Sequence, residues 1–143
     1  MKFVMRRSLL LLALAASIAP GFVAAQEGPA RTRVVVQVSD ADPVRWNLAL
    51  NNVRNLQDEL GAANVAIEIV AYGPGIAMLK FDAPTNSRVS EAIKNGVAVQ
   101  ACENTMRNQK LVRADMHPNV TYVPAGVVQI IQRQQQGWAY LRP

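Results

Sequence analysis

The sequence has few of the residues that common catalytic sites need. It contains one cysteine, Cys102, and one histidine, His117. A single cysteine excludes an internal disulfide bond, so the domain depends on its hydrophobic core for stability. His117 precedes a proline in what we expect to be an exposed loop, away from any Cys/His/Asp cluster, so we expect no metal site. No G-x-S-x-G motif accompanies it, which argues against a serine hydrolase.

The sequence also lacks an apolar run of about 20 residues, the length that a membrane-spanning helix needs. Its amino terminus instead has the three parts of a secretory signal peptide, namely the cations Lys2, Arg6 and Arg7, an apolar stretch at 8–19, and small residues ending at Ala25. We expect cleavage after Ala25, which would make the mature protein periplasmic or secreted, without a membrane segment. Residues 1–25 are then the signal peptide, 26–32 a flexible lead-in, and 33–143 a single α/β domain.

Strong charge of one sign is missing from the mature chain. The formal net charge is +5, but removing residues 1–25 lowers the count of Lys and Arg from 15 to 12, against 10 Asp and Glu, so that +2 remains. The remaining basic residues are scattered, and we expect no nucleic-acid partner. Gly73-Pro74-Gly75 fits neither a dinucleotide fingerprint nor a P-loop, so we expect no cofactor.

Strand-like and helix-like segments alternate along the rest of the chain. Runs of β-branched and apolar residues predict strands at 33–39, 65–72, 97–101, 120–123 and 138–141. Helical patterns cover 43–60, 85–95, 103–109 and 125–136. This alternation predicts a three-layer α/β fold, with a mostly parallel sheet of about five strands and helices on both faces.

Two of the predicted helices have an apolar side and a polar side in the sequence. In 43–60, Asp42 and Pro43 favour the start and Gly61 the end. The predicted core side of this helix comprises Trp46, Ala49, Leu50, Val53, Leu56 and Leu60. Its other side carries Asn47, Asn51 and Asn55, which indicate either a solvated face or, with outward Leu48, a hydrogen-bonding surface for another subunit. In 125–136 we expect Val127, Val128, Ile130 and Ile131 to face inward and the glutamines outward.

Three features fall at the carboxyl ends of predicted strands, where open α/β sheets bind ligands. They are Asp40, the Gly73-Pro74-Gly75 turn, and Cys102. A thiol at a helix amino terminus is favoured as thiolate, the reactive form, although an inward-pointing Glu103 would raise its pKa. The alternative is that Cys102 is a small apolar residue at the end of a buried strand.

Four segments of the chain resemble the DsrE/DsrF-like family, in particular its small exported members. They are VVVQVSDADPVRWNLALNNVRNLQDELG, VAYGPGIAMLK, NGVAVQACENTM and VPAGVVQIIQRQQQGWAYL, and they span most of the mature domain. The resemblance implies a flavodoxin-like three-layer fold and homo-oligomers such as trimers or hexamers. It also implies sulfur transfer between donor and acceptor proteins through a cysteine persulfide, with Cys102 at the matching position.

Three functions follow as hypotheses. The first is a periplasmic sulfur carrier or thiol relay, in which Cys102 carries the persulfide, Asn104 and Thr105 stabilise the anionic sulfur, and Asp40 and residues 73–75 border the pocket. The alternative is a non-catalytic oligomeric binding or interaction protein that retains the fold. A third hypothesis is a small-molecule or anion binder that uses the Gly73–Gly75 turn.

Overall fold

The computed structural model describes residues 31–143, and the predicted signal peptide and most of the predicted lead-in lie outside these residues. Five strands and four α-helices alternate along the described chain, with two short 3-10 helices between them. In chain order the elements are β1 Thr32–Val38, α1 Pro43–Leu60, β2 Val65–Ala71, η1 Gly73–Leu79, α2 Asn86–Lys94, β3 Ala98–Cys102, α3 Glu103–Asn108, η2 Arg113–Asp115, β4 Thr121–Val123, α4 Gly126–Gln135 and β5 Ala139–Leu141. The predicted elements are confirmed to within about two residues, and the predicted Gly-Pro-Gly turn is the start of η1.

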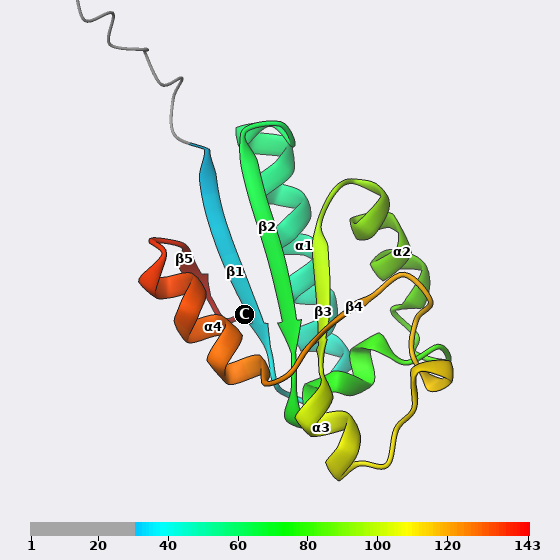
Figure 1. Cartoon of the computed structure of the whole chain (residues 1–143). Helices are drawn as coiled ribbons and strands as arrows, with labels where there is room; N and C mark the ends of the chain where they lie inside the picture. The colour runs from blue at the N-terminus through cyan, green and yellow to red at the C-terminus, as the bar shows by residue number, and fades with distance from the viewer. Residues whose placement is uncertain (1–30) are drawn as a thin grey trace, which may run out of the picture.

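The five strands form one parallel sheet in the order β4-β3-β2-β1-β5. Helices α1 and α2 cover one face, and α4 lies on the other (Figure 1). The predicted three-layer α/β class is therefore confirmed. Because all strands run in the same direction, the segments that follow them lie together at the carboxyl edge of the sheet. At this edge β3 ends and α3 begins.

The larger core lies between the sheet and helices α1 and α2. Asp42 caps α1 by accepting a hydrogen bond from the Val44 N–H at 2.9 Å, and Pro43 occupies the first turn, as the sequence indicates. The buried side of α1 consists of Trp46, Ala49, Leu50 and Val53. Leu60 was predicted for this core but is 40% exposed, because it borders an open groove beside Leu56 and Leu141.

The orientation of α4 differs from the prediction. Ile130 is buried, but Val127, Val128 and Ile131 are each about half exposed. Gly126, Gln129, Ile130 and Arg133 face the sheet instead, so the helix is rotated by roughly a third of a turn from the apolar-inward arrangement. The reason is Glu68, a buried carboxylate in β2 that hydrogen bonds Gln129 and Arg133.

Within residues 31–143 no helix is long and apolar enough to cross a membrane.

Candidate functional site

Cys102 lies at the meeting point of three elements. It is the last residue of β3 and the N-cap of α3, as the sequence predicts, and it is 4% exposed. The backbone N–H of Gly126, the first residue of α4, donates a hydrogen bond to its Sγ at 3.2 Å. Figure 1 shows α4 beginning beside the start of α3, at the carboxyl ends of the strands. The sulfur thus receives an N–H from a helix whose 10 residues direct their positive dipole end toward it.

Thr105 connects the Cys102 sulfur to the Gly73 turn. The Gly73 N–H donates to Thr105 Oγ1 at 2.9 Å, which occupies the hydroxyl as an acceptor. The hydroxyl keeps its own proton free to donate, and its position near the Cys102 sulfur contributes to lowering the pKa of the thiol. Three of the predicted site residues, namely Cys102, Thr105 and Gly73, therefore lie close together.

These contacts lower the pKa of the Cys102 thiol. Burial is the largest single effect and raises the pKa, because it disfavours the charged form. The Thr105 hydroxyl and the backbone N–H groups of Gly126, Thr105 and Asn104 act in the other direction and together outweigh burial. Of these donors, the Gly126 N–H makes the direct hydrogen bond to the sulfur. The pKa lies below the 9.0 that is ordinary for this group. The thiolate fraction of Cys102 is therefore larger than burial alone would leave it.

Glu103 does not oppose this effect. Its carboxylate forms an ion pair with Arg113 at 3.4 Å, and the Arg113 guanidinium in turn lies over the Tyr122 ring. The side chain of Asn104 is also directed elsewhere, because its amide oxygen accepts a hydrogen bond from Arg107. Of Asn104, the backbone N–H alone contributes to lowering the pKa of Cys102, and this N–H also donates to the Pro124 carbonyl oxygen at 3.2 Å.

The other predicted site residues have contacts of their own. A Cβ atom on Gly75 would lie 2.4 Å from the Val38 carbonyl oxygen, so this glycine allows η1 to pack against the end of β1. Pro74 lies beside it and is exposed. Asp40 follows β1, which is separated from β3 by β2, and it forms an ion pair with Arg142 at 3.4 Å. The structure does not bring Asp40 into hydrogen-bonded contact with the Cys102 group.

Gly126 is the main site residue that the sequence analysis missed. A Cβ atom there would lie 3.0 Å from the Tyr72 Cβ and 3.3 Å from the Cys102 Cβ, so glycine lets the backbone approach the thiol without displacing these side chains. The available signal was a glycine that opens a helix three residues after the end of a short strand. The contact with Cys102 joins residues 24 positions apart, which no local pattern reveals.

His117 is buried at 2% exposure, so the prediction of an exposed loop was wrong. Its Nδ1 accepts the Asn119 N–H at 3.2 Å, and its Nε2 lies 2.6 Å from Ser90 Oγ. Because Nδ1 is an acceptor, the neutral ring carries its proton on Nε2 and donates it to Ser90. A general base would need the lone pair of Nε2 directed at the hydroxyl, so this pair does not activate Ser90 as a nucleophile.

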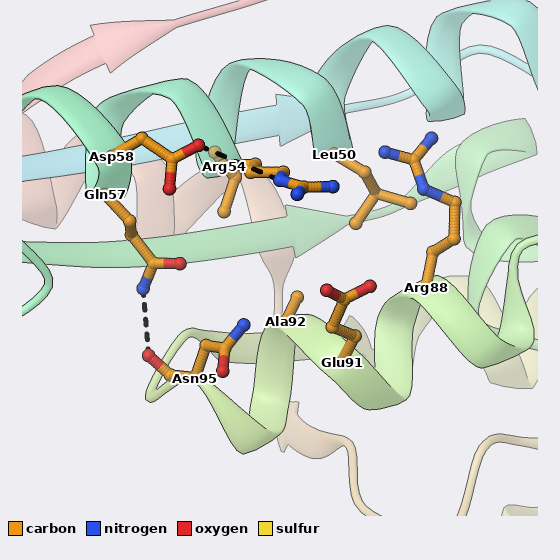
Figure 2. Close-up of a pocket in the computed structure, with 9 residues that line it drawn as sticks. Leu50, Arg54, Gln57, Asp58, Arg88, Glu91, Ala92 and Asn95 are labelled. Atoms are coloured by element: carbon orange, nitrogen blue, oxygen red, sulfur yellow. Dashed lines mark hydrogen bonds and ion pairs between the residues drawn. The ribbon is translucent and has the colours of Figure 1, made fainter.

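A polar cleft of about 180 Å³ lies between α1 and α2, on the side of the sheet opposite α4 (Figure 2). Arg54 and Asp58 of α1 face Arg88 and Glu91 of α2 across it. The cleft does not involve the Cys102 group. Among residues 31–143, no three His, Cys, Asp or Glu side chains are grouped so that they could hold a metal ion.

The asparagine face of α1 has an intramolecular use that the sequence did not indicate. Arg88 donates from Nη1 to Asn47 Oδ1 at 2.6 Å and from Nη2 to Asn51 Oδ1 at 2.7 Å. These two asparagines therefore attach α2 to α1. Asn55 remains exposed, as does Leu48.

Comparison with known proteins shows which solved structures this chain is similar to. Neither the protein-family models nor the curated proteins include a match. Among solved structures, the protein of unknown function MTH1491 from Methanobacterium thermoautotrophicum is 40% identical, with a TM-score of 0.75, over 78% of this chain and 99% of that one.

Two more distant structures show the fold alone. BT1422 from Bacteroides thetaiotaomicron is 12% identical over 78% of this chain and 94% of its own, with a TM-score of 0.64. The ychN protein from E. coli is 12% identical over 79% of this chain and 99% of its own, with a TM-score of 0.63. Given the 40% identity over nearly the whole of MTH1491, the chain belongs to the same family as that protein, and this family has a DsrE-like fold.

Proposed function

We propose that the protein is an exported sulfur carrier, in which Cys102 holds sulfur as a persulfide and passes it to an acceptor thiol. The observation that carries this proposal is the Gly126 N–H directed at the Cys102 sulfur at 3.2 Å, at the amino terminus of α4. Together with the Thr105 hydroxyl, it favours a charged sulfur in a place where burial alone would disfavour one. A cysteine that served only to fill the core would need no such donors.

The transfer is balanced without an external oxidant. The Cys102 thiolate attacks the outer sulfur of a sulfane donor such as thiosulfate. A new S–S bond forms between Cys102 and that outer sulfur, the S–S bond of thiosulfate breaks, and sulfite leaves with the electron pair. The resulting persulfide then yields its outer sulfur to an acceptor thiolate, and the Cys102 thiolate is restored as the leaving group. The donors that favour the thiolate would also stabilise the negative charge on the persulfide.

The low exposure of Cys102 restricts how a donor reaches the sulfur. With 4% of the residue exposed, we propose that either the donor is a small anion or the amino terminus of α4 moves aside during transfer. The partners in this proposal are a sulfur donor and an acceptor protein. The export of the protein rests on the predicted signal peptide.

The test uses the purified mature chain with its single cysteine. We expect incubation with thiosulfate or polysulfide to add one sulfur atom to the intact mass, and Cys102→Ser to abolish this addition. Iodoacetamide should modify the native thiol at neutral pH faster than it modifies free cysteine. Thr105→Val should slow this modification, whereas Thr105→Ser, which keeps the hydroxyl, should not. A thiol that reacts only after unfolding would contradict the proposal.

The second candidate is a non-catalytic oligomeric interaction protein. It is supported by the exposed apolar side chains of α4, because Val127, Val128 and Ile131 are each about half exposed on one side of a short helix. Apolar surface of this kind is typical of interfaces, and we propose a homo-oligomer such as a trimer or hexamer. Sedimentation of a monomer at micromolar concentration would contradict this version, whereas Cys102→Ser would leave the assembly unchanged.

A further inference from the structure

Glu68 is a charged residue in the middle of an otherwise apolar strand. It is 2% exposed, and it lies on the face of the sheet that α4 covers. Its carboxylate accepts hydrogen bonds from Gln129 Nε2 at 2.7 Å and from Arg133 Nε at 2.8 Å, and Arg133 Nη2 lies 2.8 Å from the same carboxylate oxygen as an ion pair. Both partner side chains belong to α4, so this single carboxylate fixes both the rotation and the height of the helix above the sheet.

Apolar packing contributes little to fixing the position of α4 on the sheet. Ile130 is the one large apolar side chain of α4 that is buried, and the other three face outward. The Arg133 guanidinium lies over the Trp138 ring, 4.7 Å from its centroid, which holds the arginine in place over Glu68. A buried charge pair is often no more stabilising than an apolar pair of the same volume, so stability alone does not account for it.

The same helix carries the N–H that meets the Cys102 sulfur. Gly126 and Arg133 are seven residues apart, which corresponds to about 10 Å along a helix. An α-helix of this length moves as one rigid body, so a shift at Arg133 is transmitted to Gly126. The N–H···S contact is sensitive to such a shift, since Gly126 already packs closely against Tyr72 and Cys102.

We infer that the Glu68–Arg133 pair is a positioning device for Cys102, holding α4 so that its first N–H reaches the sulfur. The role of this device in sulfur transfer rests on the function proposed above, but its effect on the thiol does not. Glu68 and Arg133 are positioning residues, because they act through Gly126 and do not touch the sulfur. Glu103, the carboxylate next to Cys102 in the sequence, is paired with Arg113.

The test measures the pKa of the Cys102 thiol from the absorbance of the thiolate, in folded protein. Glu68→Gln and Arg133→Ala should each raise this pKa by at least about half a unit, roughly a threefold fall in thiolate fraction at neutral pH. Arg133→Lys keeps the charge and should restore part of the shift. Val89→Ala is the matched control, since it destabilises the opposite core and should leave the thiol pKa unchanged.

The outcomes separate this inference from the proposed function. If Glu68→Gln fails to fold, Arg133→Lys and Arg133→Ala still test the inference, because Arg133 is partly exposed. An unchanged thiol pKa in folded Arg133→Ala would overturn it, as would an equal shift in Val89→Ala. A shifted pKa together with a wild-type protein that takes up no sulfur would support the positioning role and refute the sulfur carrier. If the wild-type protein takes up sulfur but the thiol pKa of the variants is unshifted, the sulfur carrier is supported and the positioning role is refuted.

Discussion

Adding one methyl group at Gly126 tests how the Cys102 thiol is tuned. In Gly126→Ala the new Cβ would lie 3.0 Å from the Tyr72 Cβ and 3.3 Å from the Cys102 Cβ. Both distances are shorter than ordinary van der Waals contact, so the start of α4 has to move outward. The hydrogen bond from the Gly126 N–H to the sulfur, now 3.2 Å, then lengthens and weakens.

The size of the effect follows from the strength of that bond. A hydrogen bond to a charged group contributes about 1.5–3 kcal/mol, and one pKa unit corresponds to about 1.4 kcal/mol. Partial loss of the bond should therefore raise the pKa of Cys102 by about one unit. The thiolate fraction at neutral pH then falls roughly tenfold, but the more basic thiolate is a better nucleophile, so the alkylation rate should fall only about threefold.

The effect on stability is smaller because two contributions oppose each other. Overpacking costs about 1–3 kcal/mol, whereas replacing glycine in a helix gains up to about 1 kcal/mol. We expect a net loss of about 1 kcal/mol in urea denaturation. Val127→Ala is the matched control, since its side chain is half exposed on the same turn of α4. If Gly126→Ala is folded and titrates at the wild-type pKa, the Gly126 N–H does not tune the thiol.

Two further variants test the buried groups. Burial lowers the pKa of His117 below its usual 6.5, so its contribution to stability is complete above pH 6.5 and is lost as the pH falls toward the lower folded-state value. His117→Gln can keep the bonds to Ser90 and Asn119, and it should flatten the fall in unfolding free energy between pH 7 and 5 by up to about 1.4 kcal/mol per unit. An unchanged slope would contradict the assignment. Ile130→Ala should cost about 2–4 kcal/mol in urea denaturation and Ile131→Ala less than about 1, and equal costs would refute the orientation of α4.

Much of the fold could be predicted because it depends on sequence patterns within short segments. The β-branched run at 33–39 and the capping pair Asp42-Pro43 each act within a few residues, so the boundaries of β1 and α1 were predictable. The alternation of such segments then left a parallel sheet as the simplest way to bury both kinds of element. The position of Cys102 at the end of β3 followed from the same reasoning.

The orientation of α4 could not be predicted in this way. Its apolar residues spread over nearly half of the helix surface, so periodicity favoured the wrong side. Glu68 determines which side of α4 faces the sheet, because a buried carboxylate has to be paired. Arg133 and Gln129, its partners, are on that side of the helix. A charged residue inside an apolar strand was the signal in the sequence, but its partners lie more than 60 residues away.

The sequence by itself determined the α/β class, the order of the elements and the placement of the one cysteine at the carboxyl edge of the sheet. Those features depend on hydrophobic periodicity, capping and chain direction, which act between near neighbours. Only the tertiary structure decided what surrounds the sulfur. The Gly126 N–H and the Thr105–Gly73 hydrogen bond come from segments that the folded sheet brings together, and burial and hydrogen bonding of a thiol are set by such neighbours in space.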